Sequence, residues 1–404
     1  MKYLTLIFFI SFSVSAQDIK VKNLKKHVEY LSSDKLQGRG TGTSGEKMAS
    51  EYIIKQFKKA GLSPLGENGG YLQLFPAKKG KPGKMTSVEA HNVVAYLNND
   101  KPYTIVIGAH YDHLGMGDQG SSLQANSEGQ IHNGADDNAS GVAGMLELAR
   151  YFSKNNITEN YNMVFIAFSG EELGLVGSKF IADNPTFDLK NINCMFNLDM
   201  IGRYRTDKGV NIGGVGSSKF WEENATKLAE NMAIKYTVDS SGIGPSDHTS
   251  FYLKDIPVLF LFTGAHQEYH KPTDDANLIN YEGQKLMVEY IVKMIDLLGT
   301  TDKITFKKTS NPHSQAAKST FKVTMGVIPD YSFDGKGMKI DGTTDGKPAE
   351  KAGIKAGDII QKIGDFEIKD VYGYMEALGK HEKGQTVTIK ILRKGETIEL
   401  PLTF

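Results

Sequence analysis

Residues 163–168 (MVFIAF) form the stretch that most constrains the fold of this chain. Six consecutive apolar residues match the length and composition of a strand buried on both faces of a parallel sheet. The run ends at Ser169 and Gly170, and two carboxylates, Glu171 and Glu172, follow at once. Ligands bind at the carboxyl ends of strands in an open α/β sheet, so this pair is a candidate site. The first turn of a helix also favours acidic residues, so the pair alone leaves both interpretations open.

Apolar runs of strand length alternate with segments of helical periodicity along the first three quarters of the chain. Residues 44–60 and 281–298 have apolar positions at helical spacing, and Ser44 and Gly61 are suited to start and stop the first of these helices. Residues 66–83 are predicted to form a polar loop region with one short apolar patch around residues 71–75. The alternation predicts an α/β fold, a mostly parallel mixed sheet flanked by helices. The further predicted strands are residues 92–97, 104–109, 193–198, 210–212 and 256–262.

The composition and the charge balance restrict the class of protein. A chain of 404 residues exceeds one typical domain, which predicts two. Lysine plus arginine (47) balances aspartate plus glutamate (47), so no global field favours nucleic acid or an anionic membrane, and neither is expected as a partner. The single cysteine, Cys194, lies in an apolar run and excludes a disulfide framework.

Residues 1–16 have the layout of a secretory signal peptide. Lys2 supplies a positive charge, residues 3–12 are largely apolar, and small residues precede a cleavage site after Ala16. No later segment approaches the roughly 18 apolar residues that a spanning helix needs, so no membrane span is expected. We therefore expect an exported protein, periplasmic or secreted.

Side chains that bind metals follow several of the predicted strands. Taken one at a time, each is more often a surface or capping residue than a ligand. The carboxyl ends of parallel strands converge on one edge of a sheet, however, and there such side chains can meet. Imidazole and carboxylate groups together suit zinc, or two zinc ions that share a bridging carboxylate. The candidates are His110, Asp136, Asp137, Glu171, Glu172, Asp199 and His270.

Five motifs occur in order: GAHYDH (108–113), GADDNASG (134–141), FSGEELGLVGS (168–178), NLDMIG (197–202) and EYHKPTDD (268–275). Together they resemble the zinc-dependent aminopeptidase family that also includes the glutamate carboxypeptidases. The resemblance covers roughly residues 20–300. It implies a phosphorylase/hydrolase-like α/β fold with two co-catalytic zinc ions (Zn²⁺) per chain.

Carried over by position, the resemblance assigns five zinc ligands. His110 and Asp199 would hold one ion, and Glu172 and His270 the other. Asp137 would bridge the two ions, and the peptide bond after it would be cis. Asp136 stands where the family accepts other residues and ranks second as a candidate.

The resemblance also implies residues that act on the substrate. Glu171 matches the general base, which takes a proton from the zinc-activated water and gives it to the leaving amine. Tyr269 matches the tyrosine that polarises the scissile carbonyl. His248 and Asp247 are expected near the substrate pocket.

Four further residues near these motifs have a predicted supporting role or none. Asp112 lies two residues after His110, on the same face if the strand continues, and is expected to accept a hydrogen bond from its imidazole. His113, His132 and His266 are predicted to be loop residues without an assigned role.

Residues 320–404 have short strands of their own and resemble a PDZ domain, notably at 346–365 (GKPAEKAGIKAGDIIQKIGD). PDZ domains add a peptide strand to a sheet edge and capture its terminal carboxylate on backbone N–H groups. A peptide C-terminus is therefore an expected partner, although a role as lid or spacer is equally open. Residues 300–319 are polar, lack a long apolar face and are predicted to be a linker, through which few contacts tie residues 320–404 to the catalytic domain, residues 17–299. The predicted peptide-binding residues are Gly335, Gly337, Met338 and Ile340.

Taken together, the sequence predicts an exported di-zinc exopeptidase acting on peptides, with aminopeptidase activity favoured and a C-terminal PDZ domain. One alternative is a glutaminyl-cyclase-like acyltransferase, which shares the fold and typically binds one zinc ion. Another is a catalytically inactive peptide-binding protein. The complete ligand set, with both Glu171 and Glu172 present, argues against both alternatives.

Overall fold

The structure, a computed structural model, describes residues 18–80, 85–117, 121–299, 301–309, 323–329, 335–343, 346–369 and 371–404. The predicted signal peptide, residues 1–16, and residues 310–319 of the predicted linker lie outside the described residues. No helix in the described part is long and apolar enough to cross a membrane.

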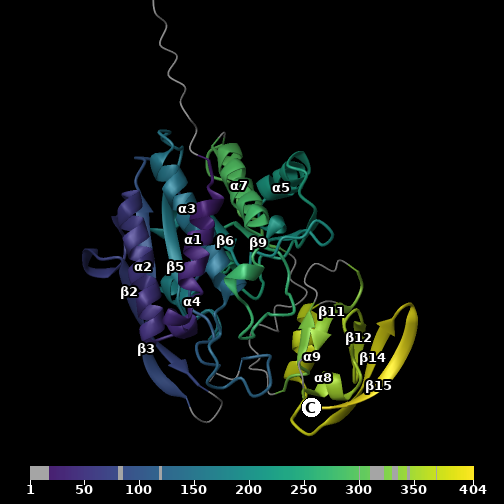
Figure 1. Cartoon of the computed structure of the whole chain (residues 1–404). Coiled ribbons are helices and arrows are strands. Elements are labelled where there is room, and N and C mark those ends of the chain that lie inside the picture. Colours follow the sequence, from purple (N-terminus) through teal and green to yellow (C-terminus); the bar gives the residue numbers. More distant parts are fainter. Residues whose placement is uncertain are drawn as a thin grey trace, which may run out of the picture.

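The first part of the described chain is a mixed sheet covered by helices on both faces (Figure 1). Its helices are α1 (Val21–Leu31), α2 (Ser44–Ala60), α3 (Gly141–Lys154), α4 (Val176–Asp183), α5 (Lys219–Asn231), α6 (His248–Tyr252) and α7 (Tyr281–Leu298). Its strands are β1 (Ser63–Pro64), β2 (Leu72–Lys79), β3 (Thr86–Leu97), β4 (Thr104–His110), β5 (Asn162–Phe168), β6 (Ile192–Leu198), β7 (Val210–Gly213), β8 (Tyr236–Val238) and β9 (Val258–Phe262).

The centre of this sheet is parallel and its borders are mixed. The strand order is β1-β3-β5-β4-β6-β9-β7-β8, with β2 paired to β3. Strands β5, β4, β6 and β9 run parallel to their neighbours in this central part, whereas β3 and β7 pair with it in antiparallel fashion. The carboxyl ends of β4, β5 and β6 therefore lie at the same edge, as the sequence predicts.

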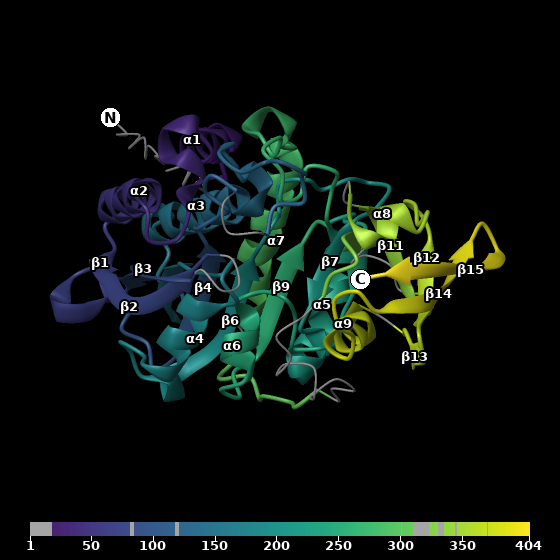
Figure 2. The ribbon, with the colours of Figure 1, turned by 90° about the horizontal axis from the view of Figure 1, so that it is seen from below.

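The continuous apolar run of β5 is explained by burial on both faces. Met163 and Phe165 join the large hydrophobic cluster under α1, α2, α3, α5 and α7, whereas Val164 and Ile166 join the cluster under α4 and α6. Figure 2 shows α1, α2 and α3 on the opposite side of the sheet from α4 and α6. Alternate residues of a strand point to opposite faces, so a strand with no polar face must be covered on both.

Two local predictions are wrong. The region 66–83 is not simply a polar loop, because β2 pairs with β3 in antiparallel register from Leu72↔Val93 to Lys79↔Thr86. Alternating burial along β2 hides Phe75 and Ala77 and exposes the residues between them, a weak signal in a short polar segment. Helix α2 is capped by Thr43, not Ser44, because the Thr43 side chain accepts the backbone N–H of Glu46.

The C-terminal part has its own hydrophobic core. Its elements are β10 (Val327–Pro329), β11 (Met338–Thr343), α8 (Pro348–Lys351), β12 (Ile359–Ile363), β13 (Phe366–Glu367), α9 (Val371–Gly379), β14 (Thr386–Arg393) and β15 (Glu396–Thr403). The strand order is β10-β11-β12-β14-β15, with β13 paired to β12. Ile340, Ile360 and Ile391 are completely buried in this core.

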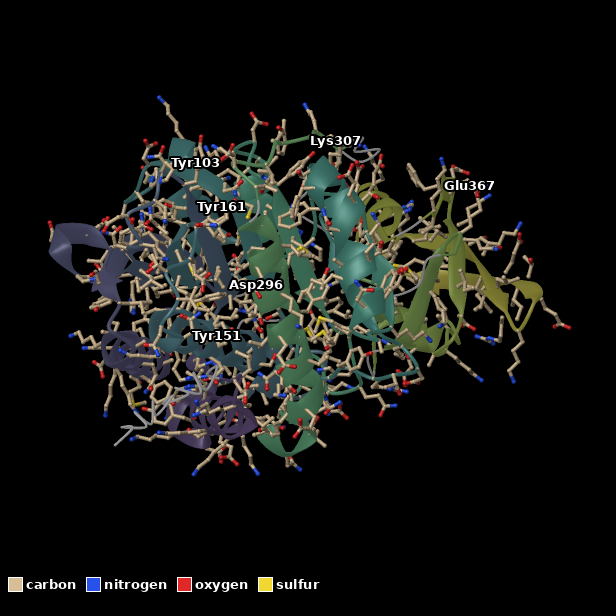
Figure 3. All side chains as sticks on the ribbon, turned by 90° about the horizontal axis from the view of Figure 1, so that it is seen from above. Tyr103, Tyr151, Tyr161, Asp296, Lys307 and Glu367 are labelled. Carbon is tan, nitrogen blue, oxygen red and sulfur yellow. The ribbon has the colours of Figure 1, made fainter. Side chains whose placement is uncertain are left out.

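Residues 301–309, the first part of the predicted linker, pack on the catalytic domain. Ile304 is buried in the large cluster, and its N–H bonds the Asn193 side chain at 2.8 Å. Tyr161 donates to the carbonyls of residues 301 and 302, and Lys307 pairs with Glu222 of α5 at 2.6 Å; Figure 3 labels Tyr161 and Lys307. Residues 301–309 therefore contact the catalytic domain closely, while the linker and the domain boundaries themselves stay a prediction.

Candidate metal centre

The first group of predicted ligands meets where β4 and β6 end. His110 is the last residue of β4, and Asp199 follows β6 directly. The Nε2 atom of His110 lies 3.3 Å from Asp199 Oδ1 and 3.3 Å from Asp137 Oδ1. All three side chains are buried or nearly so.

The second group forms around the other oxygen of the same aspartate. The Nε2 atom of His270 lies 3.2 Å from Asp137 Oδ2 and 3.3 Å from Glu172 Oε2. The two carboxylate oxygens of Asp137 thus face two different histidine–carboxylate pairs, which is the arrangement that a bridging ligand requires. The peptide bond between Asp137 and Asn138 is cis, as predicted.

The donor set fits zinc. A tetrahedral ion with bonds of about 2.0–2.1 Å separates its ligand atoms by about 3.3–3.4 Å. The separations in both groups lie at or close to this value, and imidazole with carboxylate is a ligand set that zinc accepts. Asp137 belongs to two groups of possible ligand atoms, and within each group the atoms lie within 4.8 Å of one another. One group contains His110 and Asp199, and the other contains His113 and Glu172.

His113 is a residue whose place the sequence analysis missed. It is fully buried, and its Nδ1 lies 2.8 Å from Glu172 Oε1 but 3.7 Å from Asp137 Oδ2. The short contact of His113 is typical of a hydrogen bond to Glu172. His270 instead lies at nearly equal distances, 3.2 and 3.3 Å, from Asp137 and Glu172, as a ligand of the same ion would. We therefore keep His270 as the ligand and assign His113 to the orientation of Glu172; its place in the GAHYDH motif was the available signal.

Glu171 stands beside both groups without belonging to either. Its backbone N–H donates to Asp112 Oδ1 at 3.1 Å. Burial, together with the neighbouring carboxylates of Glu172, Asp247 and Asp199, raises the pKa of Glu171 well above its ordinary value, against the opposing effect of His110. A carboxylate with a raised pKa is suited to receive a proton at neutral pH.

Asp112 supports the site in a different way from the predicted one. The nearest acceptor for His110 Nδ1 is the backbone carbonyl of Asp112, at 3.2 Å, whereas the carboxylate is 3.8 Å away. The carboxylate instead accepts the Thr41 hydroxyl at 2.8 Å and the N–H of Glu171. Asp112 therefore orients the segment that carries Glu171, while its carboxylate faces the imidazole of His110 at 3.8 Å, longer than a hydrogen bond. The predicted support of His110 by this carboxylate stays a prediction.

Tyr269 and His248 border an apolar surface near the metal ligands. The Tyr269 ring stacks on His270 with centroids 3.9 Å apart and packs against the buried cluster of Met200, Phe260, Phe262 and Ala265. The His248 ring stacks on Phe260 at 4.4 Å, and burial lowers the pKa of His248 to about 3.

Asp247 directly precedes His248 in the chain and is completely buried. Burial raises the pKa of Asp247 to about 7, while nearby His110 acts in the opposite direction. Its neighbour Ser246 donates to Asp199 Oδ2 at 2.7 Å, so this segment contacts a predicted metal ligand directly. Nothing in the sequence singles out Ser246 beyond its place before Asp247.

Arg39 is a second residue that the sequence analysis missed. Its buried guanidinium donates to the carbonyls of Tyr111 at 2.8 Å, Asn133 at 2.7 Å and Gly134 at 3.0 Å. These bonds clamp the segment after His110 to the segment before Asp137. Burial lowers the pKa of Arg39 to about 10, so it remains a cation at neutral pH. A lone arginine in a glycine-rich loop gave no signal of this contact.

The predicted peptide-binding residues of the C-terminal part lie at the start of β11. Met338 and Ile340 have buried side chains that pack in the PDZ core, and Gly335 is exposed. Gly337 has a φ of 107° and lies against Ile359 and Ile360. Peptide capture there would rest on backbone groups, and it stays a prediction.

Comparison with models of known protein families shows which family this chain belongs to. Residues 92–295 match the model described as Peptidase family M28, and residues 305–403 match that of the PDZ domain. The chain belongs to peptidase family M28. The matched region contains every predicted zinc ligand, and the predicted family, fold class, zinc metallopeptidase class and PDZ domain are confirmed.

Relatives of this M28 peptidase are diverged. "Uncharacterized protein YfbL" of Escherichia coli is 26% identical over 309 residues, covering 68% of this chain and 87% of the relative. "Leupeptin-inactivating enzyme 1" of Streptomyces exfoliatus is 26% identical, covering 61% of this chain and 50% of the relative. "Aminopeptidase YwaD" of Bacillus subtilis is 31% identical, covering 68% of this chain and 57% of the relative. The matched part of this M28 peptidase thus spans only about half of the length of the Streptomyces exfoliatus and Bacillus subtilis relatives.

Solved structures share the fold. The LapA aminopeptidase of Legionella pneumophila has a TM-score of 0.55 at 22% identity, covering 74% of this chain and 78% of its own. The glutaminyl cyclase of Porphyromonas gingivalis has a TM-score of 0.53 at 17% identity, covering 70% of this chain and 99% of its own. Identities this low show the fold of the M28 peptidase and nothing about its substrate.

Proposed function

We propose that this M28 peptidase is an exported di-zinc aminopeptidase that releases N-terminal residues from peptides. The observation that carries the proposal is the position of Asp137, whose two oxygens lie 3.3 Å from His110 and 3.2 Å from His270. A single-metal enzyme has no need of a carboxylate placed between two histidine–carboxylate pairs.

In this proposal the site residues have two kinds of role: five are zinc ligands, and Glu171 is the general base. His110, Asp199 and Asp137 would hold one zinc ion, and Glu172, His270 and Asp137 the other. Bound zinc supplies a Lewis acid and lowers the pKa of water from 15.7 to about 7.

Glu171 lies beside the ligands without filling a ligand position, and its raised pKa suits it to accept a proton and return it to the leaving amine. Asp112 holds the backbone of Glu171 in place for this transfer. Tyr269, adjacent to His270, would donate its hydroxyl to the scissile carbonyl oxygen.

Export and peptide capture complete the proposal. The charged, apolar and small-residue regions of residues 1–16 support a signal peptide and hence a periplasmic or secreted enzyme. The PDZ domain would hold the C-terminus of longer substrates at Gly335, Gly337, Met338 and Ile340, or act as a spacer.

One alternative has a specific observation in its favour. The fold is shared with a glutaminyl cyclase, so cyclisation of an N-terminal glutamine is the second candidate. The two activities differ in their products, because the cyclase releases ammonia from the glutamine side chain and leaves the peptide bond intact.

The test compares peptides that differ only at the N-terminus. The full mature chain is incubated with a free-amine tripeptide, its N-acetylated form and a glutamine-initiated peptide, each with and without a chelator. The proposal expects release of the first residue from the free-amine peptide, abolished by chelation and restored by Zn²⁺. Cleavage from the C-terminus, or cyclisation without cleavage, would refute it.

A further inference from the structure

A buried cluster of Asp136, Asp274 and His266 lies directly behind the bridging aspartate. The Asp274 Oδ2 atom accepts the backbone N–H groups of two consecutive residues, Asp136 at 2.9 Å and Asp137 at 3.1 Å. Both Asp136 and Asp274 are completely buried. One carboxylate oxygen that accepts two successive N–H groups fixes the direction of the chain at Asp137.

His266 links the two carboxylates of this cluster. Its Nε2 atom lies 3.3 Å from Asp136 Oδ2 and 3.9 Å from Asp274 Oδ1. These three atoms find no hydrogen-bond partner elsewhere among the residues that the structure describes. Burial lowers the pKa of His266, but Asp136 and Asp274 outweigh it and the net pKa is raised. The other ring nitrogen, Nδ1, faces Glu268 Oε2 at 3.2 Å.

The cluster joins three of the segments that carry the predicted ligands at the edge of the sheet. Asp136 precedes Asp137, and its Oδ1 accepts the N–H of Gly202 at 2.7 Å, three residues after Asp199. His266 and Asp274 lie four residues before and four residues after His270. A displacement within the cluster would therefore move Asp137, Asp199 and His270 relative to one another.

We propose that Asp274 and His266 are positioning residues that set the two oxygens of Asp137 toward the two metal sites. This inference rests on the proposed di-zinc function. Without the Asp274 carboxylate, two buried N–H groups lose their acceptor, and the peptide at Asp137 can turn to find another. The expected consequence is weaker zinc binding, because residues that orient metal ligands typically contribute about 10–100-fold to affinity or activity.

The test uses the full chain, freed of metal and titrated with Zn²⁺ alone. Asp274→Ala removes the acceptor, and Asp274→Asn keeps an acceptor oxygen while it removes the charge. Asp275→Asn is the matched control, because Asp275 lies next along the chain and contacts the Asn133 side chain, not residues 136–137. His266→Gln is measured in the same way in case Asp274→Ala does not fold.

We expect Asp274→Ala to weaken zinc binding by about 10–100-fold, Asp274→Asn and His266→Gln by less, and Asp275→Asn by under about threefold. The rise in melting temperature on adding zinc should shrink in the same order, whereas a purely structural residue would lower the melting temperature of the metal-free and zinc-bound forms equally. Excess zinc should restore kcat in Asp274→Ala.

Three outcomes would overturn the proposal. The first is zinc affinity in Asp274→Ala, or in His266→Gln where the former does not fold, within about threefold of the wild type. The second is an equal loss of melting temperature with and without zinc. The third is a third zinc ion per chain that His266→Gln abolishes, which would make the cluster a metal site. If the wild-type chain does not hydrolyse peptides, the proposed function fails, yet the zinc titration still decides the positioning role.

Discussion

Asp112 Oδ1 accepts the backbone N–H of Glu171 at 3.1 Å, across the gap between the segments that follow β4 and β5. The other Asp112 oxygen accepts the hydroxyl of Thr41 from the N-terminal loop. The two neighbouring parallel strands β4 and β5 thus place His110 and Glu171 at one edge of the sheet. The carboxylate of Asp112 then holds the backbone of Glu171 in place through this hydrogen bond. The position of Glu171, the proposed general base, is therefore set by this carboxylate and not by the strand alone.

Asp112→Asn should lower kcat while the chain keeps its zinc. The amide has only one acceptor oxygen, so either Thr41 or Glu171 loses its partner, and the segment carrying Glu171 loosens. We expect a loss of about 10–100-fold in kcat. The measurement is kcat with zinc content on the same preparation, with Thr41→Ser, which keeps the hydroxyl, as control. Loss of zinc in proportion to activity would show that Asp112 instead supports His110.

Glu171→Gln and Glu172→Gln should fail in different ways. Glu171→Gln removes the proton acceptor but no ligand, so zinc should be retained and kcat should fall by about 10²–10⁴-fold. Glu172→Gln removes a ligand, so about one zinc ion per chain should be lost. Zinc content and kcat of both variants decide the matter. Identical behaviour of the two would mean that the division of roles is wrong.

Glu46 should make the stability of the metal-free chain depend on pH. Burial, with Asp112 as a further cause, raises the pKa of Glu46 from 4.5 to about 8. The folded state therefore holds a proton that the unfolded state releases between these values, and the free energy of unfolding should fall as pH rises through the window, by at most about 1.4 kcal/mol per pH unit.

Glu46→Gln should remove this component, because an amide does not titrate. The measurement is urea unfolding of both chains between about pH 5 and pH 8, taken as the difference between them. A difference that stays constant across this range would show that the carboxyl of Glu46 has an ordinary pKa.

The stability of a chain truncated before the PDZ domain should depend on whether residues 301–309 are kept. Ile304 is buried in the main core, and burying such a side chain contributes about 1.5–3 kcal/mol. A chain ending after Thr309 should therefore be more stable than one ending after Leu298 by at least that amount. Denaturant unfolding of the two truncated chains tests this, and equal stability would mean that residues 301–309 only rest on the surface.

Removing the PDZ domain after Thr309 should leave the hydrolysis of short peptides nearly intact, since the zinc ligands lie between His110 and His270. We expect kcat/KM on a dipeptide-sized substrate within about tenfold of the full chain, or about 1.4 kcal/mol. A larger loss would show that the PDZ domain helps to build the site.

Part of the predicted ligand set can be read from the residues because two of its members stand at the ends of strongly apolar strands. His110 and Asp199 stand at strand ends that are readable from residues 104–109 and 193–198, and the resemblance supplies Asp137 and His270 in order. Strand β2 was not predicted because three of its eight residues, Gln73, Lys78 and Lys79, are polar, and because its pairing partner, β3, is the stronger signal.

The supporting residues could not be predicted, because their roles come from long-range contacts. Arg39 bonds carbonyls 72 to 95 residues away, and Asp274 bonds N–H groups 137 and 138 residues away. Nothing in the local pattern of a glycine-rich loop or a Thr-Asp-Asp turn indicates such partners. His113 was within reach of the sequence, since it shares a motif with His110, but a second histidine in a loop is more often ordinary.

The central claim is that Asp137 bridges two zinc ions needed for hydrolysis. The most direct measurement is a zinc titration of the metal-free full chain, in which bound zinc per chain and cleavage of a free-amine tripeptide are followed together. The account predicts no cleavage without metal, full activity at two bound ions, and loss of both sites' tight binding in Asp137→Asn. Full activity in the metal-free chain, or saturation of zinc binding and activity at a single ion, would contradict it.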